Sequence, residues 1–452
     1  MIVRPSALAC AIALVVGGGR AALGQDAAPT PEPVKGADVE LLRTVRSVGD
    51  RIATIVGRQA KADLVAVRAD EGVRAAAAKA RAETLCPSTV AAARGRAWKD
   101  LGLGGIDEPA DLALSLALDL PGMTLDAVGT RLLVDPNRLT PGSGRGDPNE
   151  DAEASLLLAT GVAPDEPVAG HYAAHLLTDD ASPPRTTDAL VARAALSEGT
   201  ANVASLILLF GGVGLEAEVV GGKLRPEDAL GGRLVASAQH PGGPAVGAFI
   251  DFIYLDGFAQ AAALAKSGEF RRLLAERKTR RTTRDVMHLD RPPAPAASLP
   301  QPVLPPALPW TVADQDTLGE EGIVVLVSLL TGKDNLGLMA GDGWAGDALW
   351  RFEAPDGSDG LTIWSTRWIS ADEAKDFEYA LERSLMGRFP GEEVHDAGPG
   401  VRILARPDRQ YRIDTKDIDV TLTVAAPAID AVLRGEAQKK KGPPARSSAP
   451  KK

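Results

Sequence analysis

The sequence predicts an α+β protein: a predominantly helical body followed by a smaller C-terminal unit of antiparallel sheet plus helix. The main observation is a change of hydrophobic period along the chain. From about residue 38 to 330 apolar residues recur at helical spacing, whereas from about 340 to 434 several short segments alternate apolar and polar residues. Only 4% of the residues are aromatic, so the core must rest mainly on Ala, Val and Leu.

The first residues have the pattern of an export signal. Arg4 precedes an apolar stretch, and Ala22-Leu23-Gly24 is a small-x-small cleavage site. We expect residues 1–24 to be a Sec-type signal peptide and the mature protein to be periplasmic or extracellular. Residues 25–37, rich in Pro and Ala, are expected to form a disordered leader. After cleavage we expect no integral membrane segment.

The first helical segment is expected between Asp38 and Arg81. This charged, Ala-rich stretch has one apolar stripe and arginines on its other face, which is typical of a long surface helix or a helical hairpin packed on the main body. A short strand is expected at Arg131–Val134. The stretch from Asn137 to Glu150 is rich in Gly, Pro, Asn and Asp and is therefore expected to be a loop.

Two adjacent helices are expected in the middle of the body. The first begins at Asp165, has Pro167 in its first turn and ends near Asp179. The second begins at Thr187 and ends at Gly211-Gly212. Further helical sequence lies at 246–266 and 270–277.

A proline-rich strap and the sheet unit follow. Residues 292–309 carry eight prolines and must be extended, either as an ordered strap or as a linker. After a helix at 317–330, Pro355-Asp356-Gly357 separates two alternating segments, which predicts a hairpin. Ser370 and Glu373 can cap the next helix. Two more strands are expected at Val401–Ala405 and Val420–Val424, and residues 435–452 form a basic tail expected to be disordered.

The charge balance and the cysteine count narrow the function. The formal net charge is −10, and nothing outside the tail resembles a basic patch, so nucleic acid is not an expected partner. One cysteine, Cys86, remains after the expected cleavage, so no intrachain disulfide can form and a buried, structural thiol is expected.

The candidate site is a pair of histidines, His171 and His175, four residues apart on one predicted helix. Residues at this spacing share a helix face, so both imidazoles can bind one metal ion. Glu198 lies in the next predicted helix among apolar residues, where a carboxylate is costly unless it is paired, exposed or bound to metal. Two histidines and such a glutamate are the protein ligands of thermolysin-like zinc sites. The alternative is a pair of half-exposed histidines and a carboxylate that is solvated or paired with Arg193.

These segments resemble exported bacterial proteins with a zinc-metallopeptidase core, the zincin type. In that family an A-H-E-x-x-H-A-L-x-D helix precedes an R-A-L-x-E-G-x-A helix, and Gly170–Asp179 and Arg193–Ala201 are similar to these two in order and spacing. The similarity continues at Asp316–Gly322 and Gly341–Asp347 and spans roughly residues 155–390. It implies a zincin-like fold for the helical body, with His171, His175 and Glu198 as zinc ligands.

The departure from the family pattern is Tyr172. The family has a glutamate there, which acts as the general base, and loss of such a base typically costs a factor of about 10² to 10⁴ in rate. Tyrosine, with an ordinary pKa near 10, cannot replace it. We therefore expect a non-catalytic relative of zinc metallopeptidases that acts by binding a peptide or protein, or as a structural component. The alternatives are an active zinc hydrolase with an atypical base, and a scaffold whose metal site has decayed.

Overall fold

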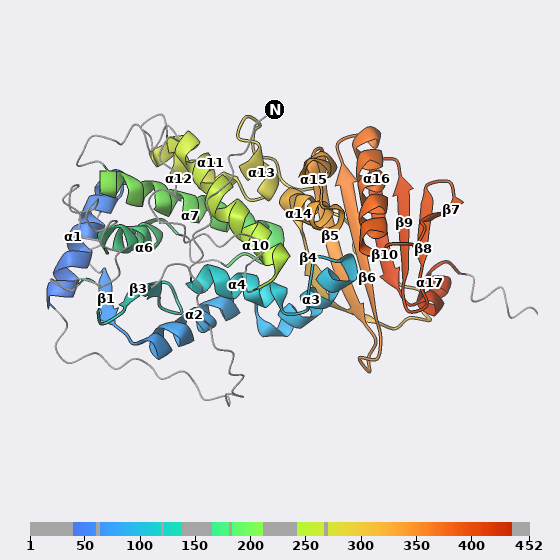
Figure 1. Cartoon of the computed structure of the whole chain (residues 1–452), viewed down its shortest axis with the longest axis horizontal. Helices are drawn as coiled ribbons and strands as arrows, with labels where there is room; N and C mark the ends of the chain where they lie inside the picture. Colours follow the sequence, from blue (N-terminus) through green and yellow to red (C-terminus); the bar gives the residue numbers. More distant parts are fainter. Residues whose placement is uncertain are drawn as a thin grey trace, which may run out of the picture. The chain divides into compact units, whose positions relative to one another are not determined.

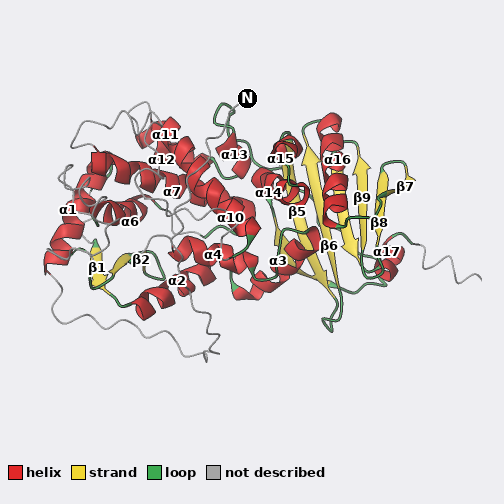
Figure 2. Cartoon of the chain, viewed as in Figure 1, coloured by secondary structure: helices red, strands yellow, loops and turns green. Residues whose placement is uncertain are grey.

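The computed structural model describes residues 39–59, 64–118, 122–137, 139, 165–179, 183–210, 242–265 and 270–435 (Figures 1 and 2). The predicted α+β class is confirmed, because helices dominate up to about residue 290 and a large antiparallel sheet with helices follows. The expected signal peptide and leader, the tail beyond Gly435 and most of the loop at 137–150 lie outside these residues.

The helical part surrounds a small three-stranded sheet. Its helices are α1 (Val39–Ile55), α2 (Glu71–Leu85), α3 (Ser88–Leu101), α4 (Glu108–Leu118), α6 (Glu166–Thr178), α7 (Thr187–Phe210), α10 (Pro244–Asp251), the π-helical turn η3 (Phe252–Asp256), α11 (Gly257–Ala265), α12 (Phe270–Thr279) and α13 (Thr283–Met287). The strands are β1 (Val65–Arg68), β2 (Met123–Leu125) and β3 (Arg131–Val134), in the order β1-β3-β2. Strand β3 has the predicted bounds.

The prediction for residues 38–81 is partly wrong. The apolar stripe that begins at Leu41 is buried on α1 as expected, and α1 packs on α6. However, β1 separates α1 from α2 and pairs in parallel with β3, more than 60 residues later. A four-residue strand whose partner is so distant leaves no periodic signal in the local sequence.

The C-terminal part is a seven-stranded antiparallel sheet with helices against it (Figure 2). The strand order is β4-β5-β6-β10-β9-β8-β7, and the bounds are β4 (Thr311–Asp316), β5 (Trp344–Glu353), β6 (Gly360–Trp368), β7 (His395–Gly398), β8 (Val401–Ala405), β9 (Gln410–Lys416) and β10 (Asp419–Ala425). The helices are α14 (Gly319–Thr331), α15 (Asp334–Gly341), α16 (Ala371–Arg388) and α17 (Pro427–Leu433).

Several predicted elements of this unit are confirmed, and its start is corrected. The hairpin is β5–β6, and Ser370 caps α16 by accepting a hydrogen bond from the backbone N–H of Glu373. Strand β4 pairs with β5, so the sheet begins at residue 311 instead of near 340. Strands β7 and β9 were not expected.

A buried carboxylate, Asp347, joins the sheet to the start of α14. Asp347 on β5 accepts hydrogen bonds from the Nε1–H groups of Trp344 and Trp364, and from the backbone N–H groups of Leu318 and Gly319 at the start of α14. Burial raises the pKa of Asp347 to about 6, although these donors oppose the rise. Trp344 and Trp364 are therefore core residues.

The proline-rich segment 292–309 is an ordered strap and not a linker. It contains neither helix nor strand, but the backbone N–H of Ala297 donates to the carbonyl oxygen of Ala345 on β5 at 2.8 Å. Leu299 and Leu304 pack against the apolar cluster around Trp350. The strap therefore covers part of the sheet.

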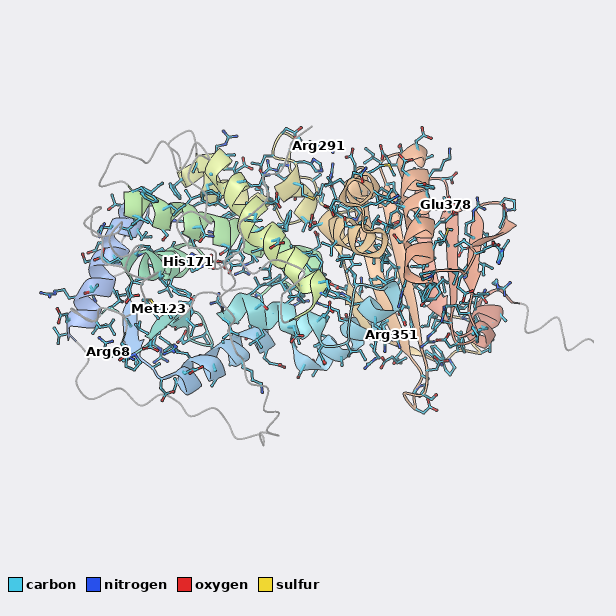
Figure 3. The ribbon with its side chains drawn as sticks, viewed as in Figure 1. Arg68, Met123, His171, Arg291, Arg351 and Glu378 are labelled. Carbon is cyan, nitrogen blue, oxygen red and sulfur yellow. The ribbon has the colours of Figure 1, made fainter. Side chains whose placement is uncertain are left out.

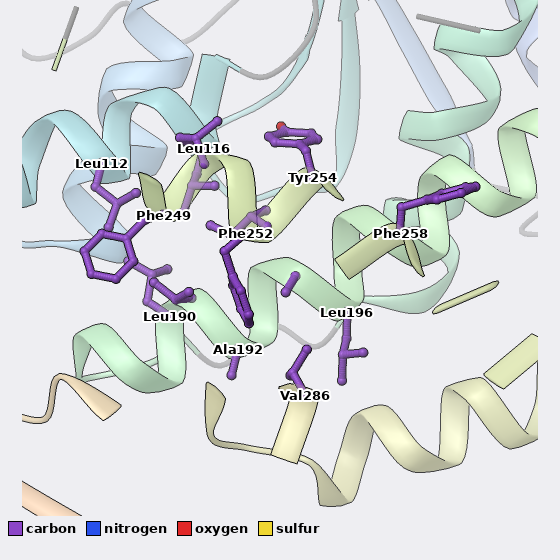
Figure 4. Packing of buried hydrophobic residues seen from close by; sticks show 14 of the residues in the cluster. Leu112, Leu116, Leu190, Ala192, Leu196, Phe249, Phe252, Tyr254, Phe258 and Val286 are labelled. Carbon is purple, nitrogen blue, oxygen red and sulfur yellow. The ribbon is translucent and has the colours of Figure 1, made fainter. Parts of the chain in front are cut away.

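The apolar helix that runs through α10, η3 and α11 lies in the core of the helical part. Pro244–Ala265 is long and apolar enough to cross a membrane by length and composition. In the fold, however, Phe249, Phe252 and Phe258 pack against α4 and α7 (Figure 4). Its hydrophobicity is thus accounted for by packing inside this fold.

A close approach between this helix and α7 supplies a first test. A Cβ on Gly199 would lie 2.2 Å from the carbonyl oxygen of Gly257. Gly199→Ala should therefore destabilise the protein by about 1 to 3 kcal/mol, although Ala is the better helix former. Thermal unfolding measures the effect, with Gly105→Ala as control because a Cβ there meets nothing within 4 Å. An unchanged or higher Tm for Gly199→Ala would contradict the packing described here.

Candidate metal centre

Two neighbouring helices bring the three predicted ligand residues together. His171 and His175 lie one turn apart on α6, which begins at Glu166 with Pro167 in its first turn, as predicted. Glu198 lies on α7, which packs along α6. All three side chains are buried, with His171 only 1% exposed. Figure 3 labels His171 on α6. The alternative of half-exposed histidines and a solvated carboxylate is therefore wrong.

The donor atoms converge on one point. The two Nε2 atoms are 3.0 Å apart, and Oε2 of Glu198 lies 3.2 Å from Nε2 of His171 and 3.4 Å from Nε2 of His175. Donor atoms that share one tetrahedral metal ion bound at about 2.0 to 2.1 Å are about 3.3 Å apart. The three residues can therefore hold a metal ion, with one coordination position left over.

Hydrogen bonds on the far side of each imidazole fix its orientation. Nδ1 of His171 lies 3.0 Å from the side-chain oxygen of Asn202, and Nδ1 of His175 lies 2.9 Å from Oδ2 of Asp179. Both oxygens are acceptors in these contacts, so each Nδ1 carries the hydrogen when the ring is neutral. Each Nε2 then presents a lone pair to the centre, which is the arrangement that metal-binding histidines need.

Asp179 is itself held in place. Its Oδ1 accepts hydrogen bonds from Ser197 Oγ at 2.6 Å and from Arg277 Nη2 at 2.7 Å. Burial would raise the pKa of Asp179, but the neighbouring His175 and Arg277 outweigh burial and hold this pKa well below its usual value. Asp179 is thus an ionised partner of His175 at neutral pH.

Without metal, two of the three residues, His175 and Glu198, have strongly shifted pKa values. Oε2 of Glu198 is buried and receives no hydrogen bond of good geometry within the described part of the chain. Burial would lower the pKa of His175, but Glu198 and Asp179 raise it to about 10. Burial would likewise raise the pKa of Glu198, yet His175 and His171 lower it to about 2. Three convergent electron-rich atoms therefore require a cation between them, and a proton on His175 fills that role without metal.

The ring of Tyr172 packs edge-on against His171, with ring centroids 5.4 Å apart, but its hydroxyl contacts β2. Its side chain is 1% exposed, and its hydroxyl donates a hydrogen bond to the carbonyl oxygen of Met123 on β2 at 2.9 Å (Figure 3 labels Met123). The hydroxyl proton is thus engaged with a backbone acceptor. At the position where the family pattern places a general base, this chain has a structural contact between α6 and the small sheet.

A small pocket adjoins the centre on the Glu198 side. It is partly open and has a volume of about 60 Å³. Its polar lining includes Glu198, Asp179 and Ser197, but neither histidine. Two arginines, Arg81 and Arg193, also line it. The centre is therefore reachable from a cavity large enough for a few water molecules.

Sequence reasoning missed the residues that orient the ligands. Asn202 and Asp179 each follow a ligand residue by four positions, Glu198 and His175 respectively, so they share a helix face with it. That spacing is the signal that could have identified them. Arg277, on α12, could not be found because its contact depends on how distant helices pack.

Cys86, the thiol noted in the sequence, does not join the centre. Cys86 is buried and free, as expected, and burial raises the pKa of its thiol to about 11. The thiol is therefore protonated at neutral pH. His240 lies outside the described residues.

Comparison with known proteins gives a family match for the C-terminal part of the chain. Residues 309–435 match a domain of unknown function, DUF8575. No curated protein and no solved structure matches the chain. The matched residues contain the whole seven-stranded sheet and helices α14 to α17, and they include none of the three residues of the metal centre.

Proposed function

We propose that this protein is an exported, non-catalytic relative of zinc metallopeptidases that retains a zinc centre and acts by binding. The observation that carries the proposal is the convergence of His171, His175 and Glu198, with donor atoms 3.0 to 3.4 Å apart. Burial and the hydrogen bonds from the far sides of both imidazoles support a metal centre over three unrelated polar residues.

Zinc is the metal that this donor set favours. Two imidazole nitrogens and one carboxylate oxygen on two helices, with one open position, form the donor set of catalytic zinc sites. Magnesium and calcium prefer sites built from oxygen donors alone. Bound zinc would supply a Lewis acid at the open position, and the residues of the chain would hold the ion and orient its ligands.

The absence of a base supports a binding role. Asp179 contacts His175, but its carboxylate is committed to His175, Ser197 and Arg277. The hydroxyl of Tyr172 is committed to Met123. A water molecule at the open position would therefore lack the group that removes its proton in active peptidases. The N-terminal sequence pattern supports export.

A substitution at position 172 tests the proposal. The zinc-loaded wild-type protein should hydrolyse a panel of fluorogenic peptides at background rate. Tyr172→Glu should raise hydrolysis above that rate, provided that the carboxylate reaches the open position. Tyr172→Phe is the control: it removes the hydroxyl but adds no base, so it should stay inactive.

Tyr172→Phe also leaves the Met123 carbonyl without its partner, which should lower stability by about 1 to 3 kcal/mol. Measuring the stability of this variant therefore shows whether a change in hydrolysis comes from a folding defect or from the chemistry of the side chain. Wild-type hydrolysis that is well above background and disappears in His171→Ala would contradict the non-catalytic role.

A further inference from the structure

The pocket beside Glu198 is lined by a positively charged side chain, Arg81, that is not part of the metal centre. We propose that this pocket binds the carboxylate group of a small acidic ligand and that Arg81 recognises it. The inference deepens the proposed function and rests on it, because it names the chemical class of the ligand that would lie next to the zinc centre.

Arg81 differs from the buried arginines of this fold. It lies on α2 and is half-buried, and its side chain makes no hydrogen bond or ion pair with the residues that the structure describes. By contrast, Arg94 pairs with Asp314 and Arg351 pairs with Asp100. A guanidinium group that lines a cavity without a partner can bind a carboxylate through two parallel hydrogen bonds.

The charges around the pocket leave room for an added anion. Its charged lining residues are Arg81, Arg193, Asp179 and Glu198. The two acidic groups are already compensated, since Asp179 pairs with Arg277 and His175, and Glu198 faces both histidines. Arg81 is therefore the charged lining group that a ligand meets without a partner among the described residues.

The remaining wall and the size of the pocket define the ligand further. Leu85, Leu116, Pro184, Leu190 and Ala194 line it, so a charge–charge contact inside is weakly screened. The pocket volume of about 60 Å³ corresponds to roughly four to six water positions at about 10 to 15 Å³ each. That space suits a carboxylate with a short aliphatic stem, as found at a peptide C-terminus or on an acidic side chain.

Binding of matched acid and amide probes tests the inference. Acetyl-Ala-Ala carries a terminal carboxylate, acetyl-Ala-Ala-amide carries none, and acetyl-Glu-amide carries one on its side chain. Dissociation constants would be measured by NMR titration of the full mature protein, with zinc loaded and after treatment with a chelator. The variants are Arg81→Gln and, as a control on the same helix, Lys79→Gln, an exposed cation outside the pocket.

We expect at least one acid probe to bind about 10-fold or more tightly than the amide in the wild type and in Lys79→Gln. In Arg81→Gln this preference should fall to within about twofold. The two acid probes distinguish a peptide terminus from an acidic side chain as the source of the carboxylate.

Two results would overturn the inference. One is equal binding of acids and amide to the wild type. The other is a preference that survives in Arg81→Gln, because the carboxylate would then be held by zinc or by another residue. Failure of the proposed function can be recognised separately. A protein that holds no zinc refutes the zinc centre. The titrations of the chelator-treated protein still decide the role of Arg81.

Discussion

Glu198→Gln is expected to lower the affinity of the protein for zinc by more than the loss of a residue that only orients a ligand. Such a loss typically costs roughly 10- to 100-fold in affinity. The substitution keeps the size of the side chain and removes the one negative charge among the three donor residues. An amide oxygen is a much weaker donor to a divalent cation than a carboxylate, and it cannot offset the charge of the ion in a buried site.

Competition with a chromophoric chelator measures this change. Glu166→Gln is the matched control, because Glu166 lies on α6 and pairs with Arg51 at the surface without reaching the centre. Its affinity for zinc should stay within about twofold of the wild type. Asn202→Ala removes the partner of His171 Nδ1 and should cost about 10- to 100-fold. Equal affinities for wild type and Glu198→Gln would show that zinc binds elsewhere.

Zinc affinity should fall steeply as the pH is lowered from 8 to 6. In the metal-free protein the pKa of His175 is raised to about 10, so its imidazole is protonated throughout this range. Zinc binds the neutral ring, and binding must therefore release this proton. The apparent affinity should drop about 10-fold for each pH unit, or roughly 100-fold over the range.

If His175 had the ordinary pKa of about 6.5, the affinity of the protein for zinc would change little between pH 7 and 8. Calorimetry in two buffers of different ionisation enthalpy counts the released protons directly. Near pH 7.5 we expect about one proton per zinc from His175. Release of none would show that His175 is neutral before the metal binds.

The raised pKa of His175 also affects the stability of the protein without metal. Because the folded-state pKa of His175 lies above its unfolded value, the stability that its proton provides is fully present below about pH 6.5. It is lost as the pH rises through about 10. The chelator-treated protein is therefore expected to unfold more easily at pH 10 than at pH 7.

The sequence was sufficient for those features that local patterns encode. The helix pair α6 and α7 could be predicted from its capping residues and apolar content, and the β5–β6 hairpin from alternation around a Pro-Asp-Gly turn. The three residues of the metal centre followed from helical spacing and from an acidic residue in an apolar helix.

The parts that could not be predicted depend on distant partners. Strand β1 exists because β3 pairs with it, and β4 because it pairs with β5 at a sheet edge with a bulge. Neither segment alternates strongly enough to be recognised alone. The contact of Tyr172 with Met123, and the pocket that α2, α4 and α7 share, likewise arise only when separate elements pack together.

The zinc content of the purified protein tests the central claim most directly. The protein, purified without added chelator and dialysed against micromolar zinc, would be analysed by inductively coupled plasma mass spectrometry. The convergence of His171, His175 and Glu198 predicts about one equivalent of zinc that Glu198→Gln fails to retain. Less than about a tenth of an equivalent in the wild type, under conditions that load a site of this type, would contradict a retained metal centre.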